Sequence, residues 1–250
     1  MGVAEWESWY GHPEPQSVKY KRSIVSYLDI LGFRELVQTK TAGEISRILR
    51  ILAESISPDP KDEPITIEFT KFSDTVIRSS PEPNPVYFIY ELKSILRAQV
   101  ALIPEGVTIR GVVTIGDIVQ SWGVVYGPAV VRAYELESLK SGPPRIIIDD
   151  EALGLLEPAA DKEKMLSASP VRKEGSTIYL DYLGACEVEF RDKDEEYPRF
   201  LEIHRDFIRR NLAKYADKPD VLRKYQWLRA YHESILQEKF GLDIPPHLSV

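Results

Sequence analysis

The sequence predicts an α+β fold in which the elements follow the order β-α-β-β-α-β and a helical region closes the chain. Runs of β-branched and aromatic residues mark the strands, and apolar residues spaced by three or four positions mark the helices. Prolines and glycines separate these segments. With 250 residues and a hydrophobic content of 43%, the chain can bury one substantial core.

The first half of this core begins with an apolar run that ends at Asp29 and is typical of a buried strand. A helix is expected to begin near Phe33 and to resume after Gly43, because isoleucines and leucines recur there at helical spacing. Residues 65–70 alternate between apolar and polar side chains, which predicts a half-buried strand. Residues 74–80 are its expected hairpin partner across a tight turn.

The second half supplies a helix, a strand hairpin, a further helix and a short strand. Gly116 is expected to open the turn of the hairpin. The expected ranges are 92–103 for the first helix, 107–115 and 119–126 for the hairpin, 129–139 for the second helix and 145–148 for the last strand. Together with the first half, these elements form the split βαβ, ferredoxin-like arrangement.

The chain divides into an N-terminal arm at residues 1–20, a core at residues 21–150 and a mostly helical C-terminal extension at residues 151–250. The elements expected in the extension are a strand at 177–180, a solvated acidic loop at 192–196 and helices at 199–214 and 218–240. An apolar stripe along the last helix predicts that the extension packs on the core or on a second copy of the chain.

Composition narrows the range of partners. A net charge of −7 and a pI near 5.3 leave no basic surplus for a nucleic acid. No apolar stretch approaches the roughly 18–20 residues of a membrane span, and the N-terminal segment is too polar for a signal peptide. The single cysteine, Cys186, excludes a disulfide within the chain and fits a reducing compartment. We therefore expect a cytoplasmic protein without a nucleic-acid or membrane partner.

Two aspartates stand out against the apolar strands. Asp29 closes the first strand and Asp74 opens the third, at positions where packing alone favours Val or Ile. In a βαββαβ sheet the first and third strands lie side by side and run antiparallel, so these two strand ends meet at one rim. The two carboxylates are therefore expected to be neighbours. The alternative for each is an aspartate that caps a strand end or a turn.

Neighbouring carboxylates repel each other and raise each other's pKa unless a cation lies between them. Mg²⁺ or Mn²⁺ is the expected cation, because both prefer hard oxygen ligands and keep positions for water and phosphate. The backbone carbonyl of Ile30 is a candidate for a further ligand. Two divalent ions in one site would suit phosphoryl transfer, with Asp29 and Asp74 as the catalytic residues.

Other residues near the first aspartate are candidates for substrate binding. Leu31, Gly32 and Phe33 lead into a helix, whose unpaired amides can hold phosphate oxygens where a glycine lets the backbone come close. Tyr27 shares a sheet face with the first aspartate and could lie under a nucleotide, although core packing is an equal alternative. Arg132 is a candidate phosphate ligand, and a solvated surface charge is the alternative.

The segments that carry these residues resemble those of one enzyme family. Residues 27–33 resemble the first-strand signature of class III nucleotidyl cyclases, and residues 72–74 resemble the segment with their second metal-binding aspartate. Residues 110–117 are similar to their later strand and hairpin, and residues 126–137 to the helix that follows. The resemblance covers residues 23–148, a little over half of the chain.

This resemblance implies a nucleotidyl cyclase core in which Asp29 and Asp74 bind two Mn²⁺ or Mg²⁺ ions, with help from the carbonyl of Ile30. It also implies a homodimer whose subunits pair head to tail and complete each other's sites. The chain departs from the purine cyclases where they carry a base-reading lysine, a base-reading acid, an orienting asparagine and a transition-state arginine. The residues at those places are Thr70, Val124, Val131 and Glu135.

With residues 224–228 included, the pattern looks most like the pyrimidine cyclases of bacterial Pycsar antiphage systems. That resemblance implies a lyase that converts UTP to 3′,5′-cyclic UMP and pyrophosphate, and a separate effector that the cyclic nucleotide activates. The alternatives are a cytidylate cyclase, a purine cyclase and a non-catalytic module that binds nucleotide. The sequence assigns no residue to base reading, no activating trigger and no effector.

Overall fold

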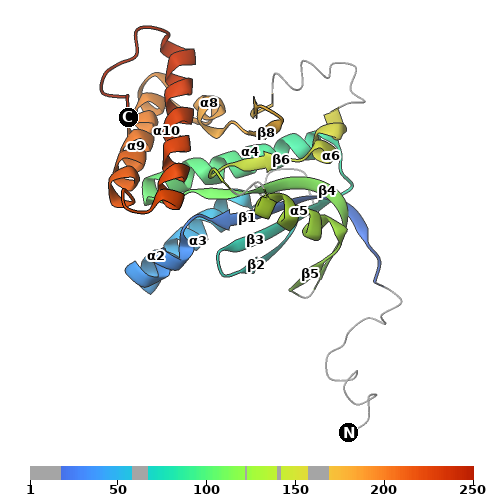
Figure 1. Ribbon diagram of the computed structural model, residues 1–250. Helices are drawn as coiled ribbons and strands as arrows, with labels where there is room; N and C mark the ends of the chain where they lie inside the picture. Colours follow the sequence, from blue (N-terminus) through green and yellow to red (C-terminus); the bar gives the residue numbers. More distant parts are fainter. Residues whose placement is uncertain (1–17, 58–66, 122, 140–141, 157–168) are drawn as a thin grey trace.

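The computed structural model describes residues 18–57, 67–121, 123–139, 142–156 and 169–250 (Figure 1). Its strands join one sheet in the order β2-β3-β1-β4-β6-β8-β7, and β5 pairs with β4. The strands are β1 (Lys21–Ile30), β2 (Glu68–Phe72), β3 (Thr75–Pro81), β4 (Ile109–Ser121), β5 (Val124–Tyr126), β6 (Ile146–Ile148), β7 (Val171–Glu174) and β8 (Thr177–Leu180). The order β2-β3-β1-β4 of the first four strands confirms the ferredoxin-like arrangement.

Helices cover both faces of this sheet (Figure 1). They are α2 (Phe33–Thr39), α3 (Ala42–Ile56), α4 (Pro85–Leu102), α5 (Pro128–Leu139), α6 (Asp150–Leu153), α8 (Tyr182–Ala185), α9 (Lys193–Lys214) and α10 (Pro219–Phe240). Alternation along β1 decides which face each helix meets. Leu28 belongs to the main core with residues of α3 and α4, whereas Val25 packs with Ala129 of α5.

Three local expectations were wrong. Gly116 does not open a turn: it pairs with Ser23 inside a long β4, and the return strand has only the three residues of β5. A Cβ at Gly116 would lie 3.1 Å from the Cβ of Ala129, so the glycine lets α5 approach the sheet. The helix expected to resume after Gly43 is instead a new helix, α3, which begins with a capping box between Thr41 and Glu44.

The third error concerns the acidic run at residues 192–196, which is the start of α9 and not a loop. The side chain of Asp192 caps this helix by accepting hydrogen bonds from the amides of Asp194 and Glu195, both at 3.2 Å. Acidic side chains in the first turn are stabilised by the positive end of the helix dipole. The acids therefore begin the helix six residues before the expected start.

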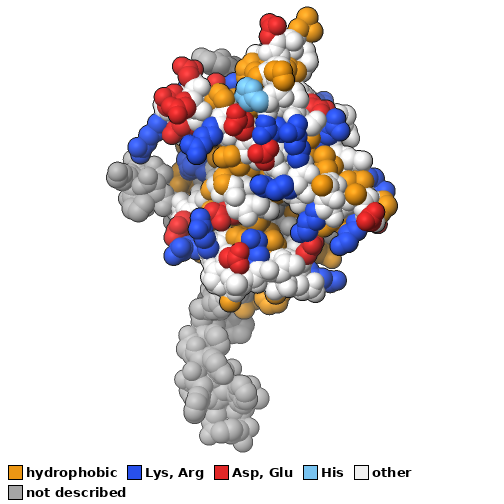
Figure 2. All heavy atoms as spheres, turned by 90° about the vertical axis from the view of Figure 1, so that its left-hand side faces the viewer, with side chains coloured by type: hydrophobic (Ala, Val, Ile, Leu, Met, Phe, Trp, Pro, Cys, Tyr) orange, Lys and Arg blue, Asp and Glu red, His pale blue; other side chains and the backbone are white. Residues whose placement is uncertain are grey.

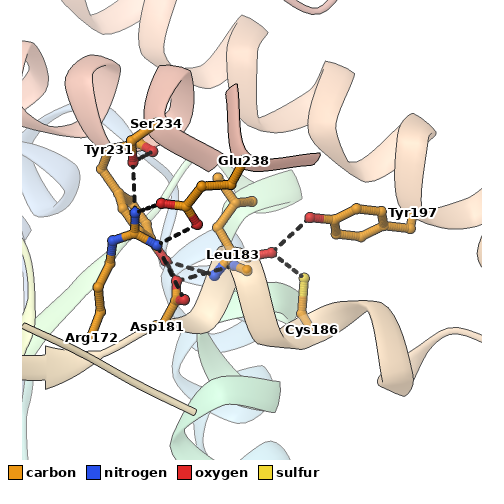
Figure 3. Close-up of polar contacts among 9 residues, drawn as sticks. Arg172, Asp181, Leu183, Cys186, Tyr197, Tyr231, Ser234 and Glu238 are labelled. Carbon is orange, nitrogen blue, oxygen red and sulfur yellow. Dashed lines mark hydrogen bonds and ion pairs between the residues drawn. The ribbon is translucent and has the colours of Figure 1, made fainter. Parts of the chain in front are cut away.

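The C-terminal extension is built into the core. The hairpin of β7 and β8 adds two strands beyond β6, and β7 is a strand that the sequence did not predict. Figure 3 shows how α10 is fastened to this hairpin: Arg172 of β7 forms ion pairs with Glu238 of α10 and with Asp181. The hydroxyl of Tyr231 donates to Asp181 at 2.6 Å and accepts from the amide of Leu183 at 2.8 Å.

A chain of hydrogen bonds joins α8, α9, α10 and the C-terminal segment in the buried interior. His232 Nε2 lies 2.9 Å from the carbonyl oxygen of Leu248, which can only accept, so this nitrogen carries the proton. The Nδ1 of neutral His232 then accepts from Nδ1 of His204 at 2.9 Å, and Nε2 of His204 accepts from the Tyr182 hydroxyl at 2.6 Å. Every link is satisfied with both imidazoles neutral, and burial disfavours the charged form of either ring.

Burial lowers the pKa of both His204 and His232 below that of a free imidazole. Below about pH 6.5 the unfolded chain therefore takes up more protons than the folded protein does. We predict that the free energy of unfolding falls in that range, by ~1.4 kcal/mol per pH unit for each proton. Chemical denaturation at pH 7.5, 6.5 and 5.5 measures this slope.

The matched comparison uses His204→Gln and His247→Gln. His247→Gln is the control, because it removes an exposed histidine, 60% accessible, that lies outside the buried chain of hydrogen bonds. His204→Gln should flatten the slope between pH 6.5 and 5.5, even if the variant is less stable at every pH. Equal slopes in wild type and His204→Gln would contradict a pH-sensitive histidine pair.

Candidate active site

The structure brings Asp29 and Asp74 together at one rim of the sheet. In the antiparallel pairing of β1 with β3, Asp29 lies opposite Thr75, so Asp74 is next to it on the neighbouring strand. The carboxyl of Asp74 is close enough to raise the pKa of Asp29 through its charge and through a side-chain hydrogen bond. The topology thus places the two acids as the sequence predicted.

A basic residue that the sequence did not assign to the site lies on the other side of Asp29. Arg110 faces Asp29 in the antiparallel pairing of β1 with β4. Its Nε and Nη2 atoms are each 3.0 Å from Oδ2 of Asp29, and its Nη1 is 3.1 Å from Oε1 of Glu137 on α5. Asp29 therefore lies between an acid on β3 and a guanidinium on β4.

The protonation of Asp29 reflects this position. Burial raises the pKa of Asp29 to about 6, the Arg110 guanidinium opposes the increase, and the Asp74 carboxylate adds to it. The side chain is 16% exposed, so the ionised form is only partly stabilised by water. A divalent cation between the two carboxylates would stabilise both charges. The oxygen donors fit a hard cation such as Mg²⁺ or Mn²⁺.

The turn that carries Asp74 has an unusual backbone. Asp74 and Ser73 connect β2 to β3, and Ser73 has a φ of 59°. A residue other than glycine rarely adopts this left-handed conformation, which costs of order 1–3 kcal/mol. The strain places Asp74 at the tip of a two-residue turn, directly beside the end of β1.

After the end of β1, Gly32 precedes α2 with a φ of 76°. This left-handed backbone conformation is one that glycine adopts without steric cost. The helix after it has seven residues, so it is shorter than the sequence suggested. The side chains of Leu31 and Phe33 are partly buried and pack against the main core. Ile30 is the last residue of β1 and its side chain is buried. A role for its carbonyl stays a prediction.

Of the remaining two candidates for substrate binding, Tyr27 lies near Asp29 and Arg132 does not. Tyr27 lies on the same face of β1 as Asp29, and its ring packs edge-on against Tyr134 of α5 with 6.5 Å between the ring centroids. Arg132 is not brought to the aspartates of its own chain. Its Nε and Nη2 atoms pair with the buried carboxylate of Asp149 at 2.5 and 2.9 Å. Its assignment as a phosphate ligand stays a prediction.

The described residues contain no group of three or more His, Cys, Asp or Glu side chains that could hold a metal ion. A cation at this rim would be held by the two aspartates and backbone oxygens, with water and phosphate completing its shell. Mg²⁺ commonly binds in this way, through one or two carboxylates and substrate phosphates.

The site is an open rim. Two cavities of about 240 and 580 Å³ lie elsewhere, and neither is lined by Asp29 or Asp74. The smaller lies where β1 begins and β4 ends, and the larger lies beside α4, β7 and α8.

Comparisons with known proteins gave matches among solved structures. No family model matches the chain, and no curated protein matches it. The adenylyl cyclase CyaB from P. aeruginosa is 16% identical over 64% of this chain and 92% of its own, with a TM-score of 0.47. A bacterial light-regulated adenylyl cyclase is 16% identical over 76% of this chain and 100% of its own, with a TM-score of 0.41. The guanylyl cyclase Cya2 is 15% identical over 65% of this chain and 92% of its own, with a TM-score of 0.40.

At such identities and TM-scores, these likenesses say nothing about what this chain does, and its chemistry has to be inferred from its own residues.

Within the parts of the chain that the structure describes, no helix combines the length and the apolar character that crossing a membrane requires.

The two neighbouring carboxylates are expected to destabilise the metal-free protein and to let a bound cation stabilise it. Because the folded pKa of Asp29 is raised above 3.8, the folded protein loses stability as pH rises from about 4 to about 6 and stays destabilised above that range. Asp74→Asn removes the neighbouring negative charge. We predict that the metal-free variant is at least as stable as wild type at pH 8, as measured by calorimetry.

The same measurement with Mn²⁺ completes the test. At 100 times its dissociation constant, Mn²⁺ should stabilise wild type by ~2.7 kcal/mol, and Asp29→Asn and Asp74→Asn should lose this gain. Asp117→Asn is the control, since Asp117 is an exposed acid on β4 that lies opposite Arg22, at the far end of β1. A gain from Mn²⁺ that persists in both site variants would rule out the cation site.

Proposed function

We propose that this protein is a metal-dependent nucleotidyl cyclase that acts on a pyrimidine nucleoside triphosphate. The observation that supports this most is the position of Asp29 between Asp74 and Arg110 at an open rim of the sheet. Two carboxylates can hold divalent cations there, and an adjacent guanidinium can neutralise phosphate oxygens. The resemblance of residues 23–148 to class III nucleotidyl cyclases supports the same reaction class.

In the proposed reaction, the 3′-oxygen of the ribose attacks the α-phosphorus of the same nucleotide. The bond from that phosphorus to the oxygen bridging to the β-phosphate breaks, so the products are a 3′,5′-cyclic monophosphate and pyrophosphate. Bound Mn²⁺ or Mg²⁺ would lower the pKa of the 3′-hydroxyl and offset the charge of the leaving group. Asp29 and Asp74 would hold the two ions, with the Ile30 carbonyl as a further ligand.

Arg110 would act on the phosphates. Its guanidinium is 24% exposed and is held by Asp29 and Glu137 on two sides, so its donors are pre-positioned at the rim. Cations bound by Asp29 would compete for that carboxylate, which frees a guanidinium edge for phosphate oxygens. The backbone from Leu31 to Phe33 lies beside Asp29 and is the proposed neighbour of the triphosphate.

The preference for a pyrimidine rests on the residues that stand where purine cyclases read the base. Thr70 is used within the sheet, because its hydroxyl accepts a hydrogen bond from Gln120 at 2.9 Å. Val124 stands at the place of the base-reading acid, is 55% exposed and has no polar group for a purine edge. We propose UTP as the substrate and CTP as the next candidate. Cyclic UMP would then serve as a second messenger in antiphage defence and activate a separate effector.

A homodimer would complete the open site. Large apolar side chains are exposed on α5, on β5 and at the end of β2, and exposed apolar side chains can mark an interaction surface. They are Phe72, Val124, Tyr126, Val131 and Tyr134, which are between 46% and 81% exposed. A second copy of the chain, paired head to tail in the cytoplasm, would cover them and supply the residues that this chain lacks at its own rim. Arg132 and Tyr27 are proposed to contact the nucleotide in that assembly.

The alternative is a nucleotide-binding module without turnover. It is favoured by the absence of an arginine and an asparagine at Glu135 and Val131, where related cyclases stabilise the transition state. This module would bind the triphosphate with its metal and signal through the C-terminal helices. It predicts stabilisation by nucleotide without any cyclic product.

Incubation of the protein with each of the four ribonucleoside triphosphates and Mn²⁺ tests the proposal, with products identified by mass spectrometry. Cyclic UMP should dominate, with cyclic CMP as the next product, and Asp29→Asn or Asp74→Asn should reduce the rate by roughly 100-fold or more. Asp117→Asn should retain the wild-type rate. Dominant cyclic AMP or cyclic GMP would reject pyrimidine selectivity, and absence of every cyclic product would favour the binding module.

A further inference from the structure

The last helix of the extension reaches the rim that carries the two aspartates. Arg145, which precedes β6, lies over the rings of Tyr179 and Trp227, with 5.6 and 5.7 Å from its guanidinium carbon to the two ring centroids. This packing fixes the middle of α10 beside the start of β6. The start of β4, where Arg110 lies, is adjacent because β4 and β6 are parallel neighbours.

Lys224 lies on the same side of α10. Positions three and four residues apart share one face of a helix, and Lys224 is three residues before Trp227 and four before the fully buried Leu228. The ammonium group of Lys224 is within electrostatic range of Arg110, Glu137 and Asp29. It is thus a second cation at the site, contributed by an element outside the βαββαβ core.

No hydrogen bond or ion pair joins Lys224 to any described residue, although its side chain is half-buried. Burial and the nearby Arg110 guanidinium lower the pKa of Lys224. A lysine held in this way beside another cation is stabilised by an anion at the rim. Figure 2 shows Lys and Arg interspersed with Asp and Glu over the face of the molecule that it presents.

A second contact fixes the hairpin of α9 and α10 relative to the segment that follows Asp29. The hydroxyl of Tyr215 donates to Oε2 of Glu35 on α2 at 2.6 Å, and Nζ of Lys214 lies 3.0 Å from Oε1 of the same carboxylate. These bonds lower the pKa of Glu35, so its carboxylate stays ionised and paired. The hairpin is therefore joined to α2, the helix that follows Asp29 along the chain.

We propose that Lys224 binds the terminal phosphates of the nucleoside triphosphate, and the pyrophosphate that leaves, within its own subunit. This role rests on the proposed cyclase function and adds a phosphate ligand from the C-terminal extension. The local charges are consistent with it. Arg110 and Lys224 oppose three carboxylates, so two divalent ions would leave the rim with a net charge of about +3, close to balance with a triphosphate of about −4.

The kinetic test compares wild type with Lys224→Gln, Lys224→Arg and the control Lys93→Gln, which removes an exposed lysine of α4. Loss of a charge-assisted contact should raise both the KM for the cyclised nucleotide and the inhibition constant of pyrophosphate about 10-fold or more in Lys224→Gln. Lys224→Arg keeps the charge and should stay within a few-fold of wild type. Stabilisation by Mn²⁺ alone should be unchanged, which shows that the metal site and the fold are intact.

Unchanged KM and pyrophosphate inhibition in Lys224→Gln, in an enzyme that cyclises nucleotide, would overturn the role of Lys224 and leave the cyclase proposal standing. Isothermal titration calorimetry with Mn²⁺ and tripolyphosphate needs no turnover. It therefore tests the phosphate role of Lys224 separately from the cyclase proposal. Should wild type make no cyclic product but bind tripolyphosphate more tightly than Lys224→Gln, the cyclase proposal fails and the phosphate site stands. Equal binding by both proteins, or binding by neither, shows that Lys224 is not a phosphate ligand.

Discussion

The pairing of β1 with β3 on one side and with β4 on the other is the constraint on which the site depends. It places Asp29 beside Asp74 and opposite Arg110, on the sheet face that α5 covers. A slip of one residue would turn Asp29 toward α3 and α4 and bring Leu28 to the rim. Burial of Leu28 in the main core therefore fixes the position of the carboxylate as firmly as its own contacts do.

The position of the C-terminal extension is also set by this sheet, because the extension is joined to the same sheet and the same core. β8 continues the sheet past β6, and Arg172 ties β7 to α10. Interactions far from the rim, including the neutral pair of His204 and His232, therefore determine where α10 lies. The stability of the helical hairpin and the electrostatics of the site are linked through that helix.

Much of this arrangement could be predicted from the sequence, because it follows from local pattern and topology. The order of the core elements and the meeting of Asp29 with Asp74 needed only strand alternation and the βαββαβ connection. Arg110 and Glu137 were not assigned to the site, since their positions depend on the register of β4 and the docking of α5. Gly116 was mistaken for a turn residue because its role is close packing against Ala129. Tertiary contacts of this kind leave no periodic signal in the sequence.

The central claim is that Asp29 and Asp74 share divalent cations at the rim of the sheet. Anomalous diffraction from crystals grown with Mn²⁺ and a non-hydrolysable analogue of UTP measures this directly. Manganese should give a peak within ligand distance of both carboxylates, with the triphosphate of the analogue beside it. Manganese bound elsewhere, with the two carboxylates turned apart and the rim free of metal and nucleotide, would contradict the account.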